Sequence, residues 1–340
     1  MISIKENVDL FPFNTFGIHA KGRYLVTVAS IDEARALFRS DWFKAHPHLI
    51  LGGGSNILLT KDFEGLVIKN EIKGITAVTE DDADIRLNVG SGENWHRLVM
   101  YCVERDLGGI ENLSLIPGTV GAAPMQNIGA YGVEIREVID HVEAIEMATG
   151  MIRNFSREEC AFGYRESIFK QHLKAMFFIS SITLTLTKKD HRFNVSYGAI
   201  KDVLAEKQVK DLSIRAISDA VIDIRKKKLP DPLLIGNAGS FFKNPSISST
   251  TFEALKKKYP TIPSFPGENN LTKIPAAWLI EQCGWKGKTL DNIGVHKHQA
   301  LVLVNYGGGD GKKIWTLAMA IQSSVKEKFD IQLQPEVNVI

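Results

Sequence analysis

Residues 49–56 read Leu-Ile-Leu-Gly-Gly-Gly-Ser-Asn, an apolar strand that runs directly into a glycine turn. An earlier strand is predicted at 24–28, and Ser30 followed by Glu33 is a capping box that predicts a helix between the two strands. Two strands joined through a helix form a β-α-β unit, which favours parallel pairing. The segments 57–59 and 66–68 are again typical of strands, so no helix directly follows the glycine turn.

The rest of the chain predicts a mixed α+β protein. Residues 142–147 and 152–155 flank Ala-Thr-Gly, which is typical of a hairpin turn. Ser213 predicts the cap of a helix that must end at 228–230, because proline cannot continue it. The residue pattern further predicts strands at 85–89, 177–186, 300–304 and 331–340 and helices at 95–102, 276–282 and 312–329.

The composition is that of an ordinary folded protein without strong charge. The chain has 340 residues, 44% of them hydrophobic and 24% charged, so two or three domains are expected. A formal net charge of +2 argues against nucleic-acid binding. The three cysteines are widely spaced, and residues 1–16 do not resemble a signal peptide, so a cytoplasmic protein is expected. The sequence has no apolar run of about 18 residues, so no membrane span is expected.

The glycine turn at 52–54 has two interpretations. Its backbone N–H groups can approach phosphate oxygens, as in a nest, or it can be a plain tight turn, and spacing alone does not separate the two. The dinucleotide fingerprint is excluded, because the G-x-G-x-x-G spacing and a following helix are absent. The loop at 307–312 does not match a P-loop, and His296 with His298 lacks a third ligand, so no metal site is predicted.

Two further stretches are unusual. Residues 117–132 crowd glycine and alanine beside an amide and an aromatic residue, which suits either a segment that hugs a flat cofactor or a loop packed on protein. Ser240 follows a glycine but does not match G-x-S-x-G, so a hydrolase nucleophile is not supported. A turn serine bonded to the backbone and a proton donor remain as its two interpretations.

Taken together and in order, the motifs resemble those of the UDP-N-acetylenolpyruvoylglucosamine reductase family over nearly the whole chain. The run at 196–198, Ser-Tyr-Gly, resembles the longer of two subtypes, in which a tyrosine loop folds over the substrate. The motifs that carry the resemblance are Asn14-Thr-Phe-Gly17, Leu51-Gly-Gly-Gly-Ser-Asn56, Ile116-Pro-Gly-Thr-Val-Gly121, Gln126-Asn-Ile-Gly-Ala-Tyr-Gly132, Phe162-Gly-Tyr-Arg-Glu-Ser-Ile-Phe169, Lys228-Leu-Pro230, Gly236-Asn-Ala-Gly-Ser-Phe-Phe-Lys-Asn244 and Gln334-Pro-Glu336.

The resemblance implies an α+β fold in which a two-lobed FAD-binding domain of the vanillyl-alcohol-oxidase (PCMH) kind precedes a smaller α/β substrate-binding domain. The expected boundaries are 1–68 for the first lobe, 69–212 for the second lobe, completed by a C-terminal strand at 330–340, and 213–329 for the substrate-binding domain. A monomer is expected.

The resemblance also implies an oxidoreductase of peptidoglycan precursor synthesis. In the family, NADPH reduces a non-covalently bound FAD, which passes hydride to the enolpyruvyl ether of a UDP-sugar and so gives UDP-N-acetylmuramate. By motif match Ser240 donates the proton, Arg165 holds the substrate carboxylate through bidentate hydrogen bonds, and Glu336 is the third catalytic residue. A charged carboxylate would repel the developing enolate, so Glu336 is either protonated or orients Arg165 or the substrate.

The match carries over further contacts. Relatives often carry tyrosine where this chain has Phe265, which lacks the hydroxyl for a phosphate contact. Two alternatives stay open: an oxidase of the same fold with covalently attached flavin, and a sugar-nucleotide-binding protein without catalytic activity. The expected FAD contacts are Gly53, Gly54, Ser55, Asn56, Pro117, Gly118, Thr119, Gly121, Gly129 and Ala130, and the expected UDP-sugar contacts are Tyr197, Lys228, Asn244, Lys273 and Gln299.

Overall fold

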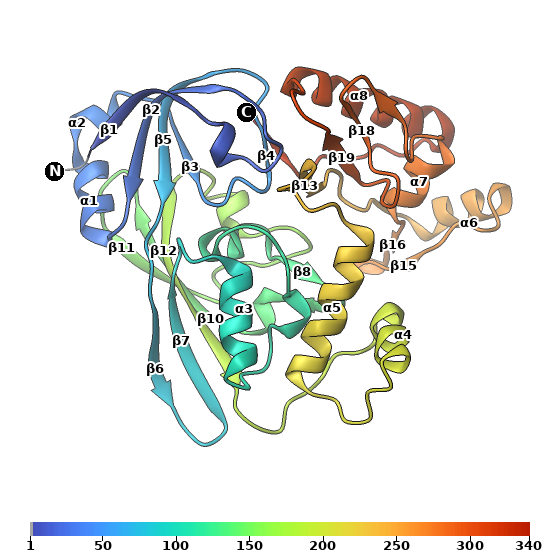
Figure 1. The fold of residues 1–340 in the computed structure, drawn as a ribbon, viewed down its shortest axis with the longest axis horizontal. Helices are drawn as coiled ribbons and strands as arrows, with labels where there is room; N and C mark the ends of the chain where they lie inside the picture. The colour runs from blue at the N-terminus through green and yellow to red at the C-terminus, as the bar shows by residue number, and fades with distance from the viewer. Residues whose placement is uncertain (1–2) are drawn as a thin grey trace. The chain divides into compact units, whose positions relative to one another are not determined.

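The computed structural model describes residues 3–340, of Glu268 the backbone alone, and these residues form two compact units (Figure 1). Unit 1 comprises residues 3–8, Gly22–Gly53 and Phe63–Lys227, and unit 2 comprises Asp9–Lys21, Gly54–Asp62 and Lys228–Ile340. Each unit is therefore discontinuous in sequence.

Unit 1 contains two sheets and the helices that cover them. Its elements, a few of which extend slightly past the bounds of the unit, are β1 (Ile4–Asp9), β2 (Lys21–Val28), α1 (Ile31–Arg39), α2 (Asp41–Lys44), β3 (His48–Leu51), β5 (Phe63–Asn70), β6 (Ile75–Glu80), β7 (Asp84–Gly90), α3 (Trp95–Glu104), η2 (Glu111–Leu113), η3 (Val120–Ala122), η4 (Pro124–Gln126), β8 (Gly129–Ala130), β9 (Val133–Glu134), η5 (Ile135–Glu137), β10 (Ile139–Glu146), β11 (Ile152–Ser156), η6 (Ile168–Lys170), β12 (Phe177–Thr187), α4 (Gly198–Glu206) and α5 (Ile214–Lys228).

The predicted β-α-β unit is present at the start of unit 1. Strands β2 and β3 each pair in parallel with β5, which lies between them, and β1 completes the order β1-β2-β5-β3. The Ser30 hydroxyl accepts the N–H of Glu33 at 3.2 Å, which confirms the predicted start of α1. Leu37 and Phe38 on α1 pack into the core of this sheet.

The second sheet of unit 1 is antiparallel, with the order β11-β10-β12-β7-β6. The predicted hairpin of β10 and β11 is confirmed, with Ile145 opposite Ile152. Helix α3 covers one face of this sheet, because Trp95, Leu98 and Val99 share a core with residues of β7, β10 and β12 (Figure 1).

Helices α4 and α5 form a smaller core of their own. Ser213 accepts the N–H of Ala216 at 3.1 Å, and α5 ends at Lys228, as the following proline requires. Ile200 and Val203 of α4 share this core with Ile217 of α5. Helix α5 therefore holds the segment that carries Tyr197, the residue directly before α4.

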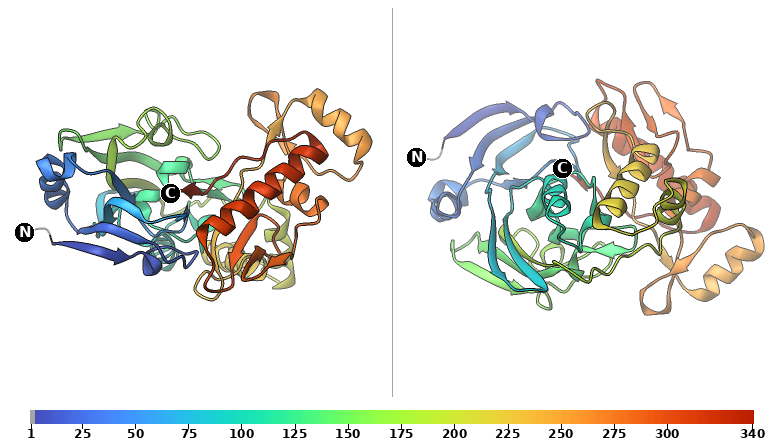
Figure 2. Two further views of the ribbon diagram at one scale, coloured as in Figure 1. Left: turned by 90° about the horizontal axis from the view of Figure 1, so that it is seen from above. Right: turned by 60° about the horizontal axis from the view of Figure 1, so that its bottom comes forward.

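Unit 2 is built around the four-stranded sheet β13-β19-β18-β17. Helix α8 packs on β18 and β19 and contacts α7 (Figure 2). Beside this sheet lies a small three-stranded sheet with the order β14-β16-β15. The elements of unit 2 are η1 (Phe11–Phe13), β4 (Ile57–Leu58), β13 (Gly236–Ser240), β14 (Ser246–Ile247), α6 (Ser249–Lys258), β15 (Phe265–Pro266), η7 (Glu268–Asn270), β16 (Thr272–Lys273), α7 (Ala276–Gln282), β17 (Thr289–Leu290), β18 (Ile293–Val295), β19 (Val302–Asn305), α8 (Gly311–Phe329) and β20 (Asn338–Val339).

The C-terminal tail differs from the single strand expected at 331–340. Only β20 at its end pairs as a strand, in parallel with β4. An alternation of apolar and polar residues is present in part, because Ile331, Leu333 and Val337 are buried while the polar residues between them are more exposed, but Val339, expected on the same face, is 37% exposed. The backbone bonds of the tail lie within unit 2, and the expected domain boundaries stay a prediction. Across the described residues, no helix has the length and apolarity needed to cross a membrane.

Candidate active site

The glycine turn and the 117–121 segment touch each other within unit 1. A Cβ atom added to Gly53 would lie 2.7 Å from the Cα atom of Gly118, so position 53 has no room for a larger residue. Gly118 also has φ +120, which a residue with a side chain rarely adopts. Two of the predicted FAD segments, far apart in sequence, are thus brought together by backbone contact.

The backbone donors of this turn are available to a ligand. Within residues 3–340, the N–H groups of Gly53 and Gly54 donate to no protein acceptor. Successive unpaired N–H groups form a nest that suits a phosphate. Packing also requires glycine at position 54, because a Cβ atom added there would collide with the backbone of Phe13 inside unit 2. Close packing therefore supports the tight-turn interpretation, and phosphate binding stays a prediction. Ser55 and Asn56 follow in unit 2, where the Asn56 amide donates to the carbonyl of Glu336 at 3.2 Å.

The 117–121 segment is fixed against α3 and the residues before it. Gly118 accepts the N–H of Trp95 at 3.1 Å, and Gly121 donates to the carbonyl of Ser91 at 2.8 Å. Pro117 directly precedes Gly118 in the chain. Thr119 is buried and directly precedes η3. These bonds give the segment a fixed backbone, as a cofactor-binding loop requires.

Gly129 and Ala130 form β8, which turns back through two residues into β9. The turn residues Tyr131 and Gly132 have φ +51 and +84, the signs of a type I′ hairpin turn. Tyrosine in this region of φ is uncommon and costs free energy, so surrounding contacts must hold it. The Tyr131 carbonyl accepts the Asn112 amide at 3.0 Å.

Arg165 reaches the same hairpin from the loop after β11. Its Nη2 donates to the carbonyl of Gly129 at 2.7 Å, and its own φ is +56. The Arg165 guanidinium therefore lies beside the predicted flavin segment at 129–130, within unit 1. A guanidinium suits a carboxylate because it can bind one bidentately.

The Tyr197 loop is fastened to the Tyr131–Gly132 turn. The Asn112 amide, 1% exposed, donates to the carbonyls of both Tyr131 and Asn194, at 3.0 and 2.8 Å. Asn194 in turn donates to the carbonyl of Gly132 at 2.8 Å. The ring of Tyr197 meets that of Tyr131 edge-on at 5.2 Å, and its side chain remains 43% exposed.

Ser240 ends strand β13 in unit 2. It lies opposite Val302 of β19, and a bulge separates it from the regular pairing of Asn237. Gly239 before it has φ +69, and its N–H donates to the Asn237 side chain at 3.0 Å. The serine hydroxyl thus projects from a kinked strand end whose backbone is bonded on both sides, because Phe241 donates to Leu301 at 2.8 Å.

Glu336 is brought next to this strand end by the tail. Its N–H donates to the carbonyl of Phe241 at 2.8 Å, and Phe242 pairs with Pro335 in an isolated antiparallel bridge. Lys243 donates to the carbonyl of Gln334 at 2.9 Å. The residue after Ser240 is therefore bonded directly to Glu336, although the two segments are far apart in the sequence.

The expected UDP-sugar contacts occupy several elements. Tyr197 belongs to unit 1, and the other four belong to unit 2. Asn244 accepts the N–H of Ala276 at 2.9 Å and so also fixes the start of α7. In the three-stranded sheet, Lys273 lies opposite both Ser246 and the exposed Phe265. The remaining two are Lys228, at the exposed end of α5, and Gln299, in the turn between β18 and β19.

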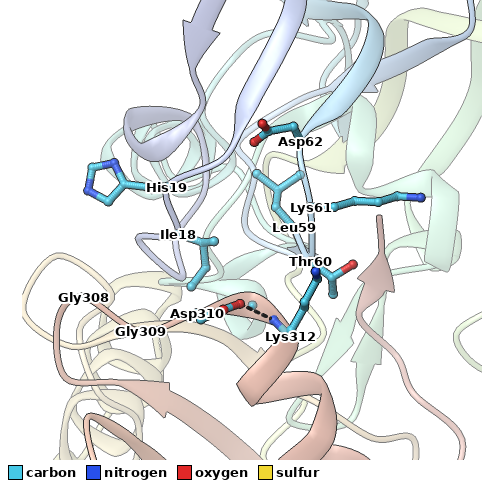
Figure 3. Close-up of a pocket in the computed structure, with 11 residues that line it drawn as sticks. Ile18, His19, Leu59, Thr60, Lys61, Asp62, Gly308, Gly309, Asp310 and Lys312 are labelled. Atoms are coloured by element: carbon cyan, nitrogen blue, oxygen red, sulfur yellow. Dashed lines mark hydrogen bonds between the residues drawn. The ribbon is translucent and has the colours of Figure 1, made fainter.

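A separate cavity of about 360 Å³ in unit 2 contains none of the predicted site residues (Figure 3). It is lined in part by the glycine loop before α8, which we rejected as a P-loop. The Asp310 carboxylate accepts the Lys312 N–H at 2.7 Å, so an acidic side chain occupies the N-terminus of α8 (Figure 3). That position would have to be vacant for a phosphate to bind there.

The two histidines near β19 do not form a metal centre. His296 is buried and lies 5.5 Å, ring to ring, from His298. Burial, followed by the charges of His298 and Lys297, lowers the pKa of His296. No group of three or more metal-ligating side chains occurs within residues 3–340.

Known proteins of high similarity match the whole chain. A relative from Amoebophilus asiaticus named UDP-N-acetylenolpyruvoylglucosamine reductase is 54% identical over 339 residues, which covers 100% of both chains. A relative of the same name from Flavobacterium johnsoniae is 45% identical over 339 residues, again with 100% of both covered. The chain belongs to the UDP-N-acetylenolpyruvoylglucosamine reductase family.

Two family models and one solved structure agree with this membership. Residues 231–340 match the C-terminal domain of UDP-N-acetylenolpyruvoylglucosamine reductase, and residues 23–156 match an FAD binding domain. The crystal structure of the reductase from Thermus caldophilus superposes with a TM-score of 0.70 at 23% identity, covering 100% of this chain and 99% of that one. The expected α+β FAD-binding fold is confirmed, and FAD is the cofactor.

The cofactor also fits the residues present. The unpaired N–H groups of Gly53 and Gly54 suit its phosphates, and the close contact of Gly53 with Gly118 lies inside the region that matches the FAD binding domain. Two residues of this region were missed from the sequence, Asn112 and Tyr131. An asparagine with 1% exposure carries no sequence pattern that distinguishes it from a core polar residue.

Proposed function

We propose that this member of the reductase family uses NADPH and FAD to reduce the enolpyruvyl ether of UDP-N-acetylglucosamine to UDP-N-acetylmuramate, for peptidoglycan synthesis. Two full-length relatives carry the corresponding enzyme name, and both family models match this chain. The observation that carries the residue assignment is the bond between the N–H of Glu336 and the carbonyl of Phe241, the neighbour of Ser240.

FAD, when bound, supplies a hydride to the terminal alkene carbon of the substrate, and NADPH is the proposed source of that hydride. As the new C–H bond forms, the alkene electron pair moves toward the substrate carboxylate and creates an enolate. We assign Arg165 to hold that carboxylate, because a guanidinium binds it bidentately and stabilises the added negative charge. Its Nη2 bond to Gly129 fixes the guanidinium against β8.

Ser240 is assigned as the proton donor to the carbon next to the carboxylate. Its O–H bond breaks as the new C–H bond forms, and solvent or a neighbouring acid returns a proton to the serine oxygen. The bulge before Ser240 and the bonds of Phe241 keep the hydroxyl on a rigid backbone. Glu336, whose backbone is bonded to Phe241, is assigned to assist either as a protonated acid or by orienting the reacting groups.

The UDP-sugar is assigned to five side chains. Lys228 and Lys273 suit the diphosphate as point charges, and Asn244 and Gln299 are amides that can bond the sugar or its phosphates. Tyr197 presents an exposed phenol on a loop that Asn112 fastens. Phe265, opposite Lys273, offers an exposed ring without a hydroxyl.

The function is tested by anaerobic mixing in two steps. NADPH should bleach the flavin absorbance of the purified protein, and the enolpyruvyl UDP-sugar should then restore it with one UDP-N-acetylmuramate formed per flavin. A sugar-nucleotide-binding protein would show neither change. A covalent-flavin oxidase of the same fold would keep its yellow colour on the chain after denaturation, whereas the proposed reductase should release it.

The cytoplasmic location and the monomeric state expected from the sequence stay predictions. Fractionation of cells and light scattering of the purified protein test them separately from the chemistry.

A further inference from the structure

Asn237 is a buried asparagine of β13, three residues before Ser240, and no assignment above uses it. It is 5% exposed, and its side-chain amide is bonded at both of its polar atoms. The Nδ2 atom donates to the carbonyls of Pro230 at 3.2 Å and of Ile235 at 2.8 Å. The Oδ1 atom accepts the N–H of Gly239 at 3.0 Å. One side chain therefore joins the segment before β13 to the residue directly before Ser240, within unit 2.

The bond to Gly239 lies at the β-bulge of this strand. Asn237 pairs with Val304, and Ser240 pairs with Val302, so two residues of β13 lie opposite one residue of β19. Gly239, the second of these two residues, has φ +69, a value that favours glycine. A Cβ atom added there would meet nothing within 4 Å, so the position requires glycine for its backbone conformation and not for room. The Asn237 side chain thus bonds the residue at which the strand is kinked.

The bulge decides which face of the sheet carries the Ser240 hydroxyl. Side chains alternate between the two faces along a strand, so one extra residue reverses the face of every side chain beyond it. The ring of the next residue, Phe241, lies 6.4 Å from that of Trp315 on α8, so Phe241 points toward α8. Ser240 therefore points to the opposite face, and without the bulge it would point toward α8.

The other end of the amide holds the turn that follows Lys228, an expected contact of the UDP-sugar. Pro230 lies two residues after Lys228, and its carbonyl accepts one of the amide hydrogens of Asn237. The turn is also closed by its own backbone, because the N–H of Ile235 donates to the carbonyl of Asp231 at 2.9 Å. The amide therefore connects the turn after a substrate residue to the bulge before the assigned proton donor.

A second asparagine of unit 2 has the same burial and bonding but holds a different part of the unit. Asn305 is 4% exposed, and its Nδ2 donates to the carbonyls of Phe16 and Gly17 at 2.8 and 3.2 Å. Its Oδ1 accepts the N–H groups of Gly307 and Gly309 at 3.0 and 2.9 Å. None of these four partners is an assigned site residue or a chain neighbour of one. The two asparagines therefore separate a positioning role from a purely structural one.

We propose that Asn237 is a positioning residue for the proton transfer, because its amide holds the bulge that keeps the Ser240 hydroxyl on the sheet face away from α8. Asn237 does not touch the reacting atoms, and no proton passes through it. Its contribution is geometric, since a displacement of about 1 Å at a reacting group can slow a reaction about a hundredfold. This proposal rests on the role proposed above for Ser240.

The test is a double-mutant cycle on the two half-reactions of the holoenzyme, followed by stopped flow. Asn237→Ala should slow reoxidation of the flavin by the enolpyruvyl UDP-sugar about ten- to a hundredfold and leave reduction by NADPH unchanged. In the Ser240→Ala background the same substitution should change reoxidation by less than about twofold, because the residue through which it acts is absent. The matched control, Asn305→Ala, should change both backgrounds by one common factor.

A second pair of variants disturbs the bulge without altering the asparagine, and it keeps the test decisive if Asn237→Ala folds poorly. Gly239→Ala strains the backbone at φ +69, where the added Cβ has open space. Gly284→Ala imposes the same kind of strain at φ +75, also with open space around the Cβ, elsewhere in unit 2. Both variants should lose similar stability in urea, and only Gly239→Ala should slow reoxidation.

Two outcomes would overturn the proposal. One is equal slowing of reoxidation by Asn237→Ala with and without Ser240, or slowing no greater than that by Asn305→Ala. The other is equal reoxidation rates in Gly239→Ala and Gly284→Ala. Failure of the proposed function is distinct, because the wild-type flavin would then not be reoxidised by the UDP-sugar, whereas normal reoxidation in Ser240→Ala would refute the role of the serine and this proposal with it.

Discussion

In unit 1 the predicted cofactor segments are held by contact between glycines, whereas in unit 2 the predicted catalytic residues are held by backbone bonds between a strand end and the tail. Gly53 and Gly118 leave no room for a side chain between them. Ser240 and Glu336 are instead positioned by backbone bonds between residues 241–243 and residues 334–336. The first arrangement depends on the absence of side chains, so substitution should damage binding. The second positions Ser240 and Glu336 through their backbone, so substitution of either side chain should leave the fold unchanged.

The largest expected effect is on the glycine contact. Gly53→Ala would place a Cβ 2.7 Å from Gly118 Cα, and overpacking of this kind costs about 1–3 kcal/mol. FAD affinity, measured by fluorescence titration of the apoprotein, should fall about ten- to hundredfold. The control is Gly198→Ala, at a position with no heavy atom near the added Cβ and no positive φ. Equal FAD affinity in the two variants would contradict the glycine account of unit 1.

A smaller effect is expected at the Tyr197 loop. Asn112→Ala removes the two bonds that fasten this loop to the Tyr131 turn. Hydrogen bonds of this kind contribute about 1 kcal/mol each, so the dissociation constant of the UDP-sugar should rise about tenfold with FAD content unchanged. Asn154→Ala, at an exposed site on β11, is the control. Loss of FAD in step with loss of substrate would show instead that Asn112 merely stabilises unit 1.

The stability of unit 1 should depend on pH through His96. Burial, followed by the charges of Arg225 and Lys226, lowers the pKa of His96 in the folded protein. The unfolded chain then binds the proton first, so the contribution is complete above pH of about 6.5 and is lost as pH falls toward the lower folded value.

Urea unfolding at pH 7.5 and 5.5 checks this prediction. Between pH 7.5 and pH 5.5 the free energy of unfolding of the wild type should fall by a fraction of the ~1.4 kcal/mol per pH unit that the binding of one proton can contribute. His96→Gln keeps an acceptor for the Leu115 N–H and should lose less stability over the same interval. If the free energy of unfolding depends on pH identically in both proteins, His96 does not cause the loss of stability.

The smallest effect compares the cysteines of the two units. Burial raises the pKa of Cys102 and of Cys160 in unit 1 to about 12, so neither thiol should react with Ellman's reagent at pH 8 while the protein is folded. Cys283 in unit 2 is only half-buried and should react first. Cys283→Ser should therefore abolish native labelling, and continued labelling would indicate opening of unit 1.

Much of the fold could be predicted from residue pattern. Helix α7 has the predicted bounds, and the β10–β11 hairpin is as expected, because long periodic segments and turn residues report local structure directly. The three-stranded sheet β14-β16-β15 was missed, since strands of two residues have no periodicity. Most of the tail forms no ladder, because its backbone bonds depend on partners in the segment after β13 and at β4, which the tail sequence does not specify.

The residues of the candidate site were predicted from the family resemblance, and residue chemistry and spacing alone indicated only some of them. Local sequence left Ser240 as a turn serine or a donor, and the bond of Glu336 to Phe241 was invisible because it joins distant segments. Arg225 was hidden in a basic run that reads as a solvated helix end. Only the fold distinguishes it from its exposed neighbours, because its Nε donates to the carbonyl of Leu115.

The central claim, that Ser240 serves the proton transfer and not the cofactor, is tested most directly by stopped-flow kinetics of Ser240→Ala with the two half-reactions separated. Reduction of the flavin by NADPH should match the wild type, and reoxidation by the enolpyruvyl UDP-sugar should slow by about 10²–10⁴-fold. Ser246→Ala, an exposed serine of the same unit, should change neither rate. Equal slowing of both half-reactions in Ser240→Ala, or a normal rate of reoxidation, would contradict the account.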